Sequence, residues 1–249
     1  MANEKTDTTP SADKEVHVML SGAFAAAYTD LIPTFEKKTG FTVVTIRGPS
    51  MGTTDDAIPV RLGRGERADV LIMAGEAIPT LVDAGKVVKD SRVDLVRSPI
   101  GAAVRAGAPK PDISTPDALR NTLLQAKSVA YSDSASGVYV HTKLFKLLGI
   151  EAQIQDKARM IPETPVGQIV AEGKAEIGMQ QVSELMPVAG IELLGPLPDA
   201  VDKFSLFSAA LTTNAVSPAG GQALIDFLSS PEAAPTIRKT GLEPIPHST

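Results

Sequence analysis

Short apolar strands alternate with amphipathic helices along almost the whole chain, and this alternation limits the fold more than any other feature. The segment Ala68–Ala74 (ADVLIMA) carries the apolar run that is typical of a parallel strand buried on both faces. The segment Ala23–Lys38 instead spaces its large apolar residues at helical intervals, and Gly40 follows as a helix stop. Such alternation predicts a layered α/β protein with mainly parallel sheets flanked by helices.

The remaining elements follow from the same patterns. Six further segments have the alternation or β-branched content of strands, and these are Glu15–Leu20, Phe41–Ile46, Ser98–Gly107, Ser128–Tyr131, Glu176–Gln180 and Phe204–Thr212. Seven segments between and after them have helical spacing, and these are Ala57–Leu62, Glu76–Asp83, Pro116–Gln125, Val138–Leu148, Pro165–Glu172, Pro218–Leu228 and Pro231–Lys239. The polar residues 1–14 predict a flexible leader.

Composition excludes several classes of partner and chemistry. The net charge of −5 and the absence of Trp argue against nucleic acid and anionic membranes, and no apolar run is long enough for membrane insertion. The absence of Cys excludes disulfides and thiolate chemistry. Because His17, His141 and His247 show no ligand spacing and no nucleotide or hydrolase motif is present, we expect no metal and no cofactor.

Three turns share one design, in which an apolar strand ends, a turn with Ser and Gly follows, and a helix begins. They lie at Ser21, Ser50 and Ser134. The first turn of a helix offers unpaired N–H groups and a partial positive charge, which attract an anion. The alternative for each turn is simple N-capping. We expect ligand contacts from Ser21, Gly22, Ala23, Ser50, Met51, Thr53, Ser134, Ala135, Ser136, Gly137 and Val138.

Two further groups of residues stand where strands end. Arg47 directly follows a strand, and its guanidinium can grip a carboxylate with two hydrogen bonds or simply face solvent. The amides of Gln180 and Gln181 can donate to a ligand oxygen or satisfy loop carbonyls. We add Pro165 and Val166, at the start of an expected helix, to the candidate ligand contacts.

Taken in order, these segments resemble the molybdate-binding branch of the type II periplasmic solute-binding proteins. The similarity covers nearly all of residues 15–244 and rests on VHVMLSGAFAAAYTDLIPTFEKKTGFTVVTIRG, RGERADVLIMAGEAIPTLVDAGKV, SVAYSDSASGVYVHTKLFKLLGI and AEIGMQQVSEL. The resemblance implies a hinge between two lobes, with residues 15–98 and 205–249 in the first lobe and 99–204 in the second. It further implies a periplasmic, monomeric protein, its signal peptide removed, that serves ABC-type uptake with a membrane permease as partner.

The sequence departs from that branch at positions that bear on the ligand. The branch usually has Ser where Ala23 aligns and Tyr near Gln181, and its oxyanion sites do not need a cation such as Arg47. We therefore expect a small anion that is an organic di- or tricarboxylate rather than molybdate. A regulatory ligand sensor is a further alternative.

The branch also resembles aconitate isomerase, so an enzyme that moves a double bond by proton transfer is the alternative function. A base would then be needed in the cleft. The candidates are Glu163, Asp133, Tyr139 and His141, with Glu163 preferred on position.

Overall fold

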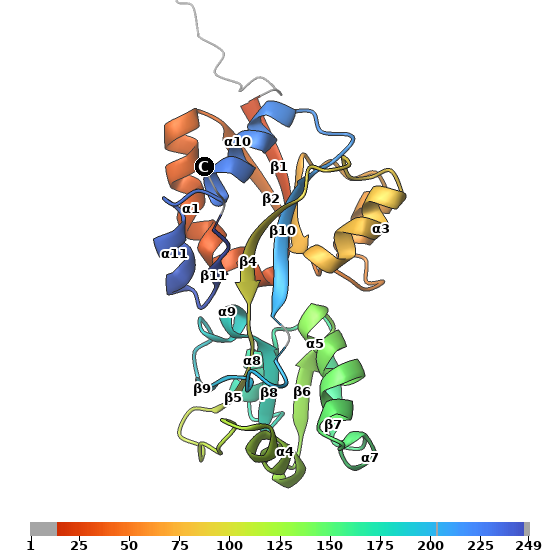
Figure 1. Cartoon of the computed structure of the whole chain (residues 1–249), viewed down its shortest axis with the longest axis vertical. Coiled ribbons are helices and arrows are strands. Elements are labelled where there is room, and N and C mark those ends of the chain that lie inside the picture. Colours follow the sequence, from red (N-terminus) through yellow and green to blue (C-terminus); the bar gives the residue numbers. More distant parts are fainter. Residues whose placement is uncertain (1–13, 203, 247–249) are drawn as a thin grey trace, which may run out of the picture.

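Residues 14–202 and 204–246, described by the computed structural model, form two mixed sheets flanked by helices and stacked along the long axis of the molecule (Figure 1). We call the six-stranded sheet and its helices lobe 1, and the five-stranded sheet and its helices lobe 2. The sheet of lobe 1 has the order β11 (Glu243–Pro244), β4 (Val93–Ser98), β10 (Ser205–Leu211), β3 (Val70–Ala74), β1 (Glu15–Leu20), β2 (Thr42–Arg47). The sheet of lobe 2 has the order β7 (Ala158–Ile161), β6 (Val129–Ser132), β8 (Ile177–Gln181), β5 (Ile100–Arg105), β9 (Ile191–Pro196).

The helices divide between the lobes in the same way. Those of lobe 1 are η2 (Gly22–Phe24), α1 (Ala25–Thr39), α2 (Ile58–Gly63), η3 (Gly75–Ala77), α3 (Ile78–Asp83), α10 (Pro218–Leu228) and α11 (Ala234–Lys239). Those of lobe 2 are α4 (Pro116–Gln125), α5 (Ala135–Tyr139), η4 (Val140–Leu144), α6 (Phe145–Leu147), α7 (Glu151–Ile154), α8 (Val166–Ala171) and α9 (Val182–Leu185). None of the helices in the described residues is long and apolar enough to cross a bilayer.

The parallel pairings lie at one side of each sheet. In lobe 1, β1 pairs in parallel with β2 and β3, and in lobe 2, β6 pairs in parallel with β7 and β8. The other pairings are antiparallel and involve β4, β5, β9, β10 and β11. The chain crosses between the lobes from β4 to β5 and from β9 to β10. Of these strands, β10 in lobe 1 and β5 in lobe 2 run opposite to the parallel strands, which makes each sheet mixed.

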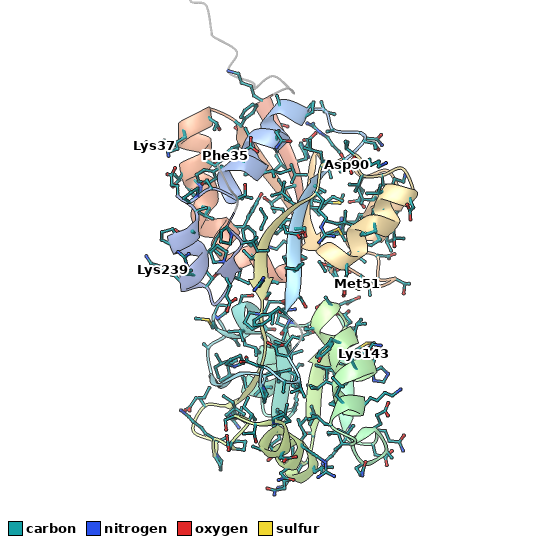
Figure 2. All side chains as sticks on the ribbon, in the orientation of Figure 1. Phe35, Lys37, Met51, Asp90, Lys143 and Lys239 are labelled. Carbon is teal, nitrogen blue, oxygen red and sulfur yellow. The ribbon has the colours of Figure 1, made fainter. Side chains whose placement is uncertain are left out.

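Each lobe has its own apolar core. In lobe 1, Phe35 of α1 is fully buried and stacks on Phe41 with ring centroids 6.3 Å apart, whereas Lys37 on the same helix is exposed (Figure 2). In lobe 2, α4 and the helical run 135–147 pack Leu119 and Leu144 against Val129 of β6. Apart from Ala135 of α5, which packs into the main cluster of lobe 1, the apolar clusters of the two lobes are separate.

Most expected elements are present, with shifted ends. Gly40 ends α1 with a φ of 75°, and Thr115 caps α4 by accepting from the Ala118 amide at 3.1 Å. The helix expected to begin at Val138 begins at Ala135, because the last three residues of the DSASG turn are already helical. Strands β4, β7, β9 and β11 were not expected, since these short segments mix apolar and charged residues. The expected leader lies outside the described residues except for Lys14, as does His247.

Candidate ligand-binding cleft

The carboxyl ends of the parallel strands in both sheets border one cleft of about 290 Å³. In lobe 1, β1 and β2 end at Leu20 and Arg47, and in lobe 2, β6 and β8 end at Ser132 and Gln181. Ligands of open α/β sheets bind beyond these ends. The cleft is lined by Ser21, Gly22, Arg47, Gly48, Pro49, Ser50, Asp56 and Phe207 of lobe 1 and by Ser132, Asp133, Ser134, Ala135, Glu163, Thr164, Pro165, Gln180 and Glu184 of lobe 2.

Ser21 brings an unused hydroxyl to the cleft. Its backbone N–H donates to the Ile72 carbonyl at 2.9 Å, which ties the turn to β3. The side chain is 3% exposed, does not cap η2, and finds no hydrogen-bond partner for Oγ among the described residues. A buried hydroxyl without a partner is costly unless something else bonds to it. The N-capping alternative therefore fails here, and the hydroxyl remains without a partner among the described residues.

The hydroxyl of Ser50 accepts one hydrogen bond within lobe 1 and can still donate another. The Ala74 amide at the end of β3 donates to Ser50 Oγ at 2.9 Å. A hydroxyl that accepts one bond can still donate one. The loop before it turns tightly, because a Cβ at Gly48 would lie only 2.0 Å from the Asp56 carbonyl oxygen. Only glycine permits this approach, and so Gly48 fixes the path that carries Ser50 to the cleft.

In lobe 2 a cluster of serines forms the matching turn. Ser132 Oγ lies 3.1 Å from Ser134 Oγ and 2.9 Å from Ser136 Oγ, and Ser134 makes no capping bond with its side chain. A Cβ at Gly137 would lie 1.5 Å from the Ser132 carbonyl oxygen, so the helix starts in close contact with β6. Of these serines, Ser132 and Ser134 line the cleft, whereas Ser136 is fully buried and contacts Ser132.

Arg47 is the one cationic side chain among the cleft-lining residues. It is exposed, and its guanidinium donates to Thr29 Oγ1 at 3.3 Å. Within residues 14–202 and 204–246 no carboxylate forms an ion pair with it, although Asp56 also lines the cleft. Its charge is therefore available to an anion that enters.

Glu184 also lines the cleft, although it was not among the residues expected from the sequence. It is partly buried in α9, where Gln180 Nε2 donates to Glu184 Oε2 at 2.6 Å. Gln180 is itself fixed, since its Oε1 accepts from the Val166 amide at 3.0 Å. Burial, together with the nearby charge of Asp133, raises the pKa of Glu184 from 4.5 to about 7, although the Gln180 hydrogen bond opposes the shift. The usable signal was position, because Glu184 follows the end of β8 by three residues, at the edge where the other site residues lie.

Several expected contacts lie outside the cleft lining. Ala23 is buried, and its carbonyl accepts from Ser183 Oγ of lobe 2 at 2.7 Å. Gln181 is buried at the crossing between the lobes, where its amide can bond to Ser98 and Ser205. The other expected contacts that are not part of the cleft lining are Met51, Thr53, Ser136, Gly137, Val138 and Val166.

Two of the four candidate bases line the cleft and two do not. Asp133 and Glu163 line the cleft, and Glu163 has a φ of 59°, a left-handed conformation unusual for a residue other than glycine. Tyr139 instead donates to the Val201 carbonyl at 2.6 Å, and His141 pairs with the Tyr131 hydroxyl at 3.2 Å. Both belong to lobe 2 packing and lie outside the cleft lining.

Two lobes joined by two crossings, with a polar cleft at the strand ends, define the type II periplasmic-binding-protein fold. The chain belongs to the bacterial extracellular solute-binding protein family, whose profile matches residues 16–243. A small molecule is thus the partner that the family binds.

The named relatives of this chain include both an enzyme and anion-binding proteins. The chain is 48% identical over 229 residues to an aconitate isomerase of a Pseudomonas species, covering 92% of this chain and 87% of that protein. It is 24% identical to the molybdate-binding protein ModA of Azotobacter vinelandii, covering 91% of this chain and 89% of that protein. The sulfate-binding protein SubI of Mycobacterium tuberculosis superposes with a TM-score of 0.73 at 17% identity, covering 93% of this chain and 87% of that one. The resemblance inferred from the sequence is therefore confirmed.

Proposed function

We propose that the chain binds a small organic di- or tricarboxylate in the cleft and closes its lobes around it. The observation that carries the proposal is Arg47, a cation without an acidic partner among the described residues, at the edge of a cleft that also holds the open Ser21 hydroxyl. A guanidinium binds a carboxylate through two parallel hydrogen bonds. A tetrahedral oxyanion such as molybdate can be held by neutral donors alone, so the added cation favours a carboxylate.

The charges of the cleft limit how the anion is held. Four carboxyl side chains, those of Asp56, Asp133, Glu163 and Glu184, line the same cleft as Arg47. A bound polycarboxylate would be repelled by them if all were ionised. The raised pKa of Glu184 relieves part of this, because its neutral form can donate a hydrogen bond to a ligand carboxylate.

In the cell, the proposed setting is the periplasm, with the ligand passed to an ABC permease. Closure would occur at the two crossings, near Pro99 and near Ser205, where β4 leads into β5 and where β10 begins. A ligand that contacts both lobes stabilises the closed form by its difference in affinity for the two forms.

Calorimetry and thermal-shift measurements test the binding proposal. The ligand panel should contain molybdate, tungstate, sulfate and phosphate beside citrate, tricarballylate and cis- and trans-aconitate. A ligand that binds only the folded state raises the melting temperature. We expect the tricarboxylates to do so and the inorganic anions to have little effect; the reverse order would contradict the proposal.

A second candidate is isomerisation of such a ligand by proton transfer. It is favoured by the 48% identity to an aconitate isomerase and by the carboxyl groups that line the cleft. Incubation with cis- or trans-aconitate, followed by proton NMR, separates the two functions. Steady interconversion supports the enzyme, and tight binding without turnover supports transport alone.

A further inference from the structure

We propose that Glu184 is the catalytic residue that takes a proton from the methylene carbon of the bound ligand and returns it to the alkene carbon. The inference rests on the second candidate function above. It assigns the reaction to one side chain of lobe 2 that lines the cleft and lies against the first turn of lobe 1.

The first support is position. Glu184 lines the cleft, and a Cβ at Gly22 would lie 2.7 Å from Glu184 Oε2. The carboxyl group thus lies directly against the first turn of lobe 1, beside Ser21, whose hydroxyl has no partner among the described residues. A ligand held by that turn would be in reach of Glu184. Gly22 leaves the space that the carboxyl group occupies.

The second support is how the carboxyl group is held. Gln180 donates to one oxygen, Oε2, at 2.6 Å and is fixed from behind by the Val166 amide. No cation forms an ion pair with Glu184 in the described part of the chain, so its charge is not neutralised. A general base needs a fixed orientation and an oxygen free to take the proton. Oε1 of Glu184 meets both needs.

The other charged groups of the cleft fit this role less well. Glu163 is exposed, and no hydrogen bond to the carboxyl group of Glu163 or of Asp133 is present among residues 14–202 and 204–246. Asp56 belongs to lobe 1 and has a buried Oδ1 without a partner there. Arg47 is the positive group that would hold a ligand carboxylate. The environment of Glu184 also raises its pKa to about 7, which suits a group that must both accept and release a proton near neutral pH.

The proposed step is a proton shift across three carbons. Ionised Glu184 removes one proton from the methylene group, and the C–H electron pair becomes the new carbon–carbon double bond. The electron pair of the old double bond takes the proton back from Glu184 at the other alkene carbon. The carboxylate is regenerated, no oxidant or reductant takes part, and the ligand keeps its composition.

The test compares wild type with Glu184→Gln, with Glu151→Gln as the matched control on the exposed surface of lobe 2. Proton NMR in D2O follows both the interconversion of cis- and trans-aconitate and the exchange of methylene protons with solvent. We expect Glu184→Gln to slow both by about 100-fold or more and the control to change neither. Binding of the saturated analogue tricarballylate shows that the variant is folded.

The outcomes distinguish a failure of the enzyme function from a failure of the role of Glu184 alone. If wild type binds tricarballylate but neither isomerises nor exchanges, the enzyme function and the role of Glu184 both fail. If wild type turns over and Glu184→Gln keeps its rate, only the role of Glu184 fails, and Glu163→Gln and Asp133→Asn then locate the base. In support, the rate (kcat/KM) of wild type should rise with pH through about 7 as Glu184 ionises.

Discussion

The two walls of the cleft are built alike but carry opposite chemistry. On each side, parallel strands end in a serine-bearing turn where a glycine allows close backbone contact, Gly48 in lobe 1 and Gly137 in lobe 2. Lobe 1 adds Arg47, and lobe 2 contributes three of the four carboxyl side chains. The shared backbone design creates the cleft, and the side chains at the strand ends decide its chemistry. We infer that lobe 1 attracts an anion and lobe 2 handles a proton.

The largest expected effect concerns the backbone design that both walls share. Gly137→Ala places a methyl group 1.5 Å from the Ser132 carbonyl oxygen, and Gly48→Ala places one 2.0 Å from the Asp56 carbonyl oxygen. Since neither backbone can move freely, each variant should lose about 3 kcal/mol or more of stability. Thermal melting would measure it.

Gly63→Ala is the matched control for this pair. A Cβ there meets nothing within 4 Å, and Gly63 is the last residue of α2. We expect it to leave the melting temperature unchanged or slightly higher. If Gly137→Ala melts like this control, the tight turn of lobe 2 is not needed.

The next prediction concerns Arg47, the cation that lobe 1 brings to the cleft. Arg47→Ala should weaken binding of a tricarboxylate by about 1.5–2 kcal/mol, because a charge-assisted hydrogen bond is lost. Arg47→Lys should recover part of the loss, since it keeps the charge without the paired donors. Calorimetry gives the affinities, with Arg159→Ala, an exposed arginine on β7 of lobe 2, as control. An unchanged Kd for Arg47→Ala would remove Arg47 from the site.

The next prediction concerns the carboxyl groups of lobe 2 and the pH dependence of stability. The pKa of Glu184 is raised from 4.5 to about 7 in the folded protein, so folding disfavours its charged form. The protonated carboxyl group therefore contributes to the stability of the fold below about pH 4.5. This contribution is lost as the pH rises toward 7 and is absent at higher pH. We therefore expect the free energy of unfolding to fall as the pH rises across this range. Glu184→Gln should lack this part of the pH dependence in thermal melts; a parallel pH profile for both proteins would show that the carboxyl group is not responsible.

The smallest effect concerns the contact between the walls. Ser183 of lobe 2 is buried and donates to the Ala23 carbonyl of lobe 1 at 2.7 Å. Ser183→Ala leaves that carbonyl without this partner, which costs about 1 kcal/mol. Because the bond joins the lobes, we expect weaker ligand binding by a few-fold and a larger radius of gyration in small-angle scattering. A loss of melting temperature without a change in shape would assign Ser183 to folding alone.

Local sequence patterns predicted most of the elements and part of the cleft. Ser21, Ser50, Ser134 and Arg47 were found because a strand, a turn and a helix start follow one another within a few residues. Strands such as β7 (ARMI) and β9 (IELLGP) were missed, because their pairing partners and not their own pattern make them strands. Gln181 was expected in the cleft, but its buried amide lies beside Ser98 at the crossing between the lobes.

The sequence by itself determined the α/β alternation, the family and the edge at which a ligand would bind, since each depends on residues close together in the chain. The tertiary structure decided which side chains meet across the cleft. Gly22 and Glu184 are far apart in the sequence, and only the packing of α9 of lobe 2 against η2 of lobe 1 brings them together. The environment that raises the pKa of Glu184 depends on the same packing, because burial and neighbouring charges arise only when the lobes are folded and joined.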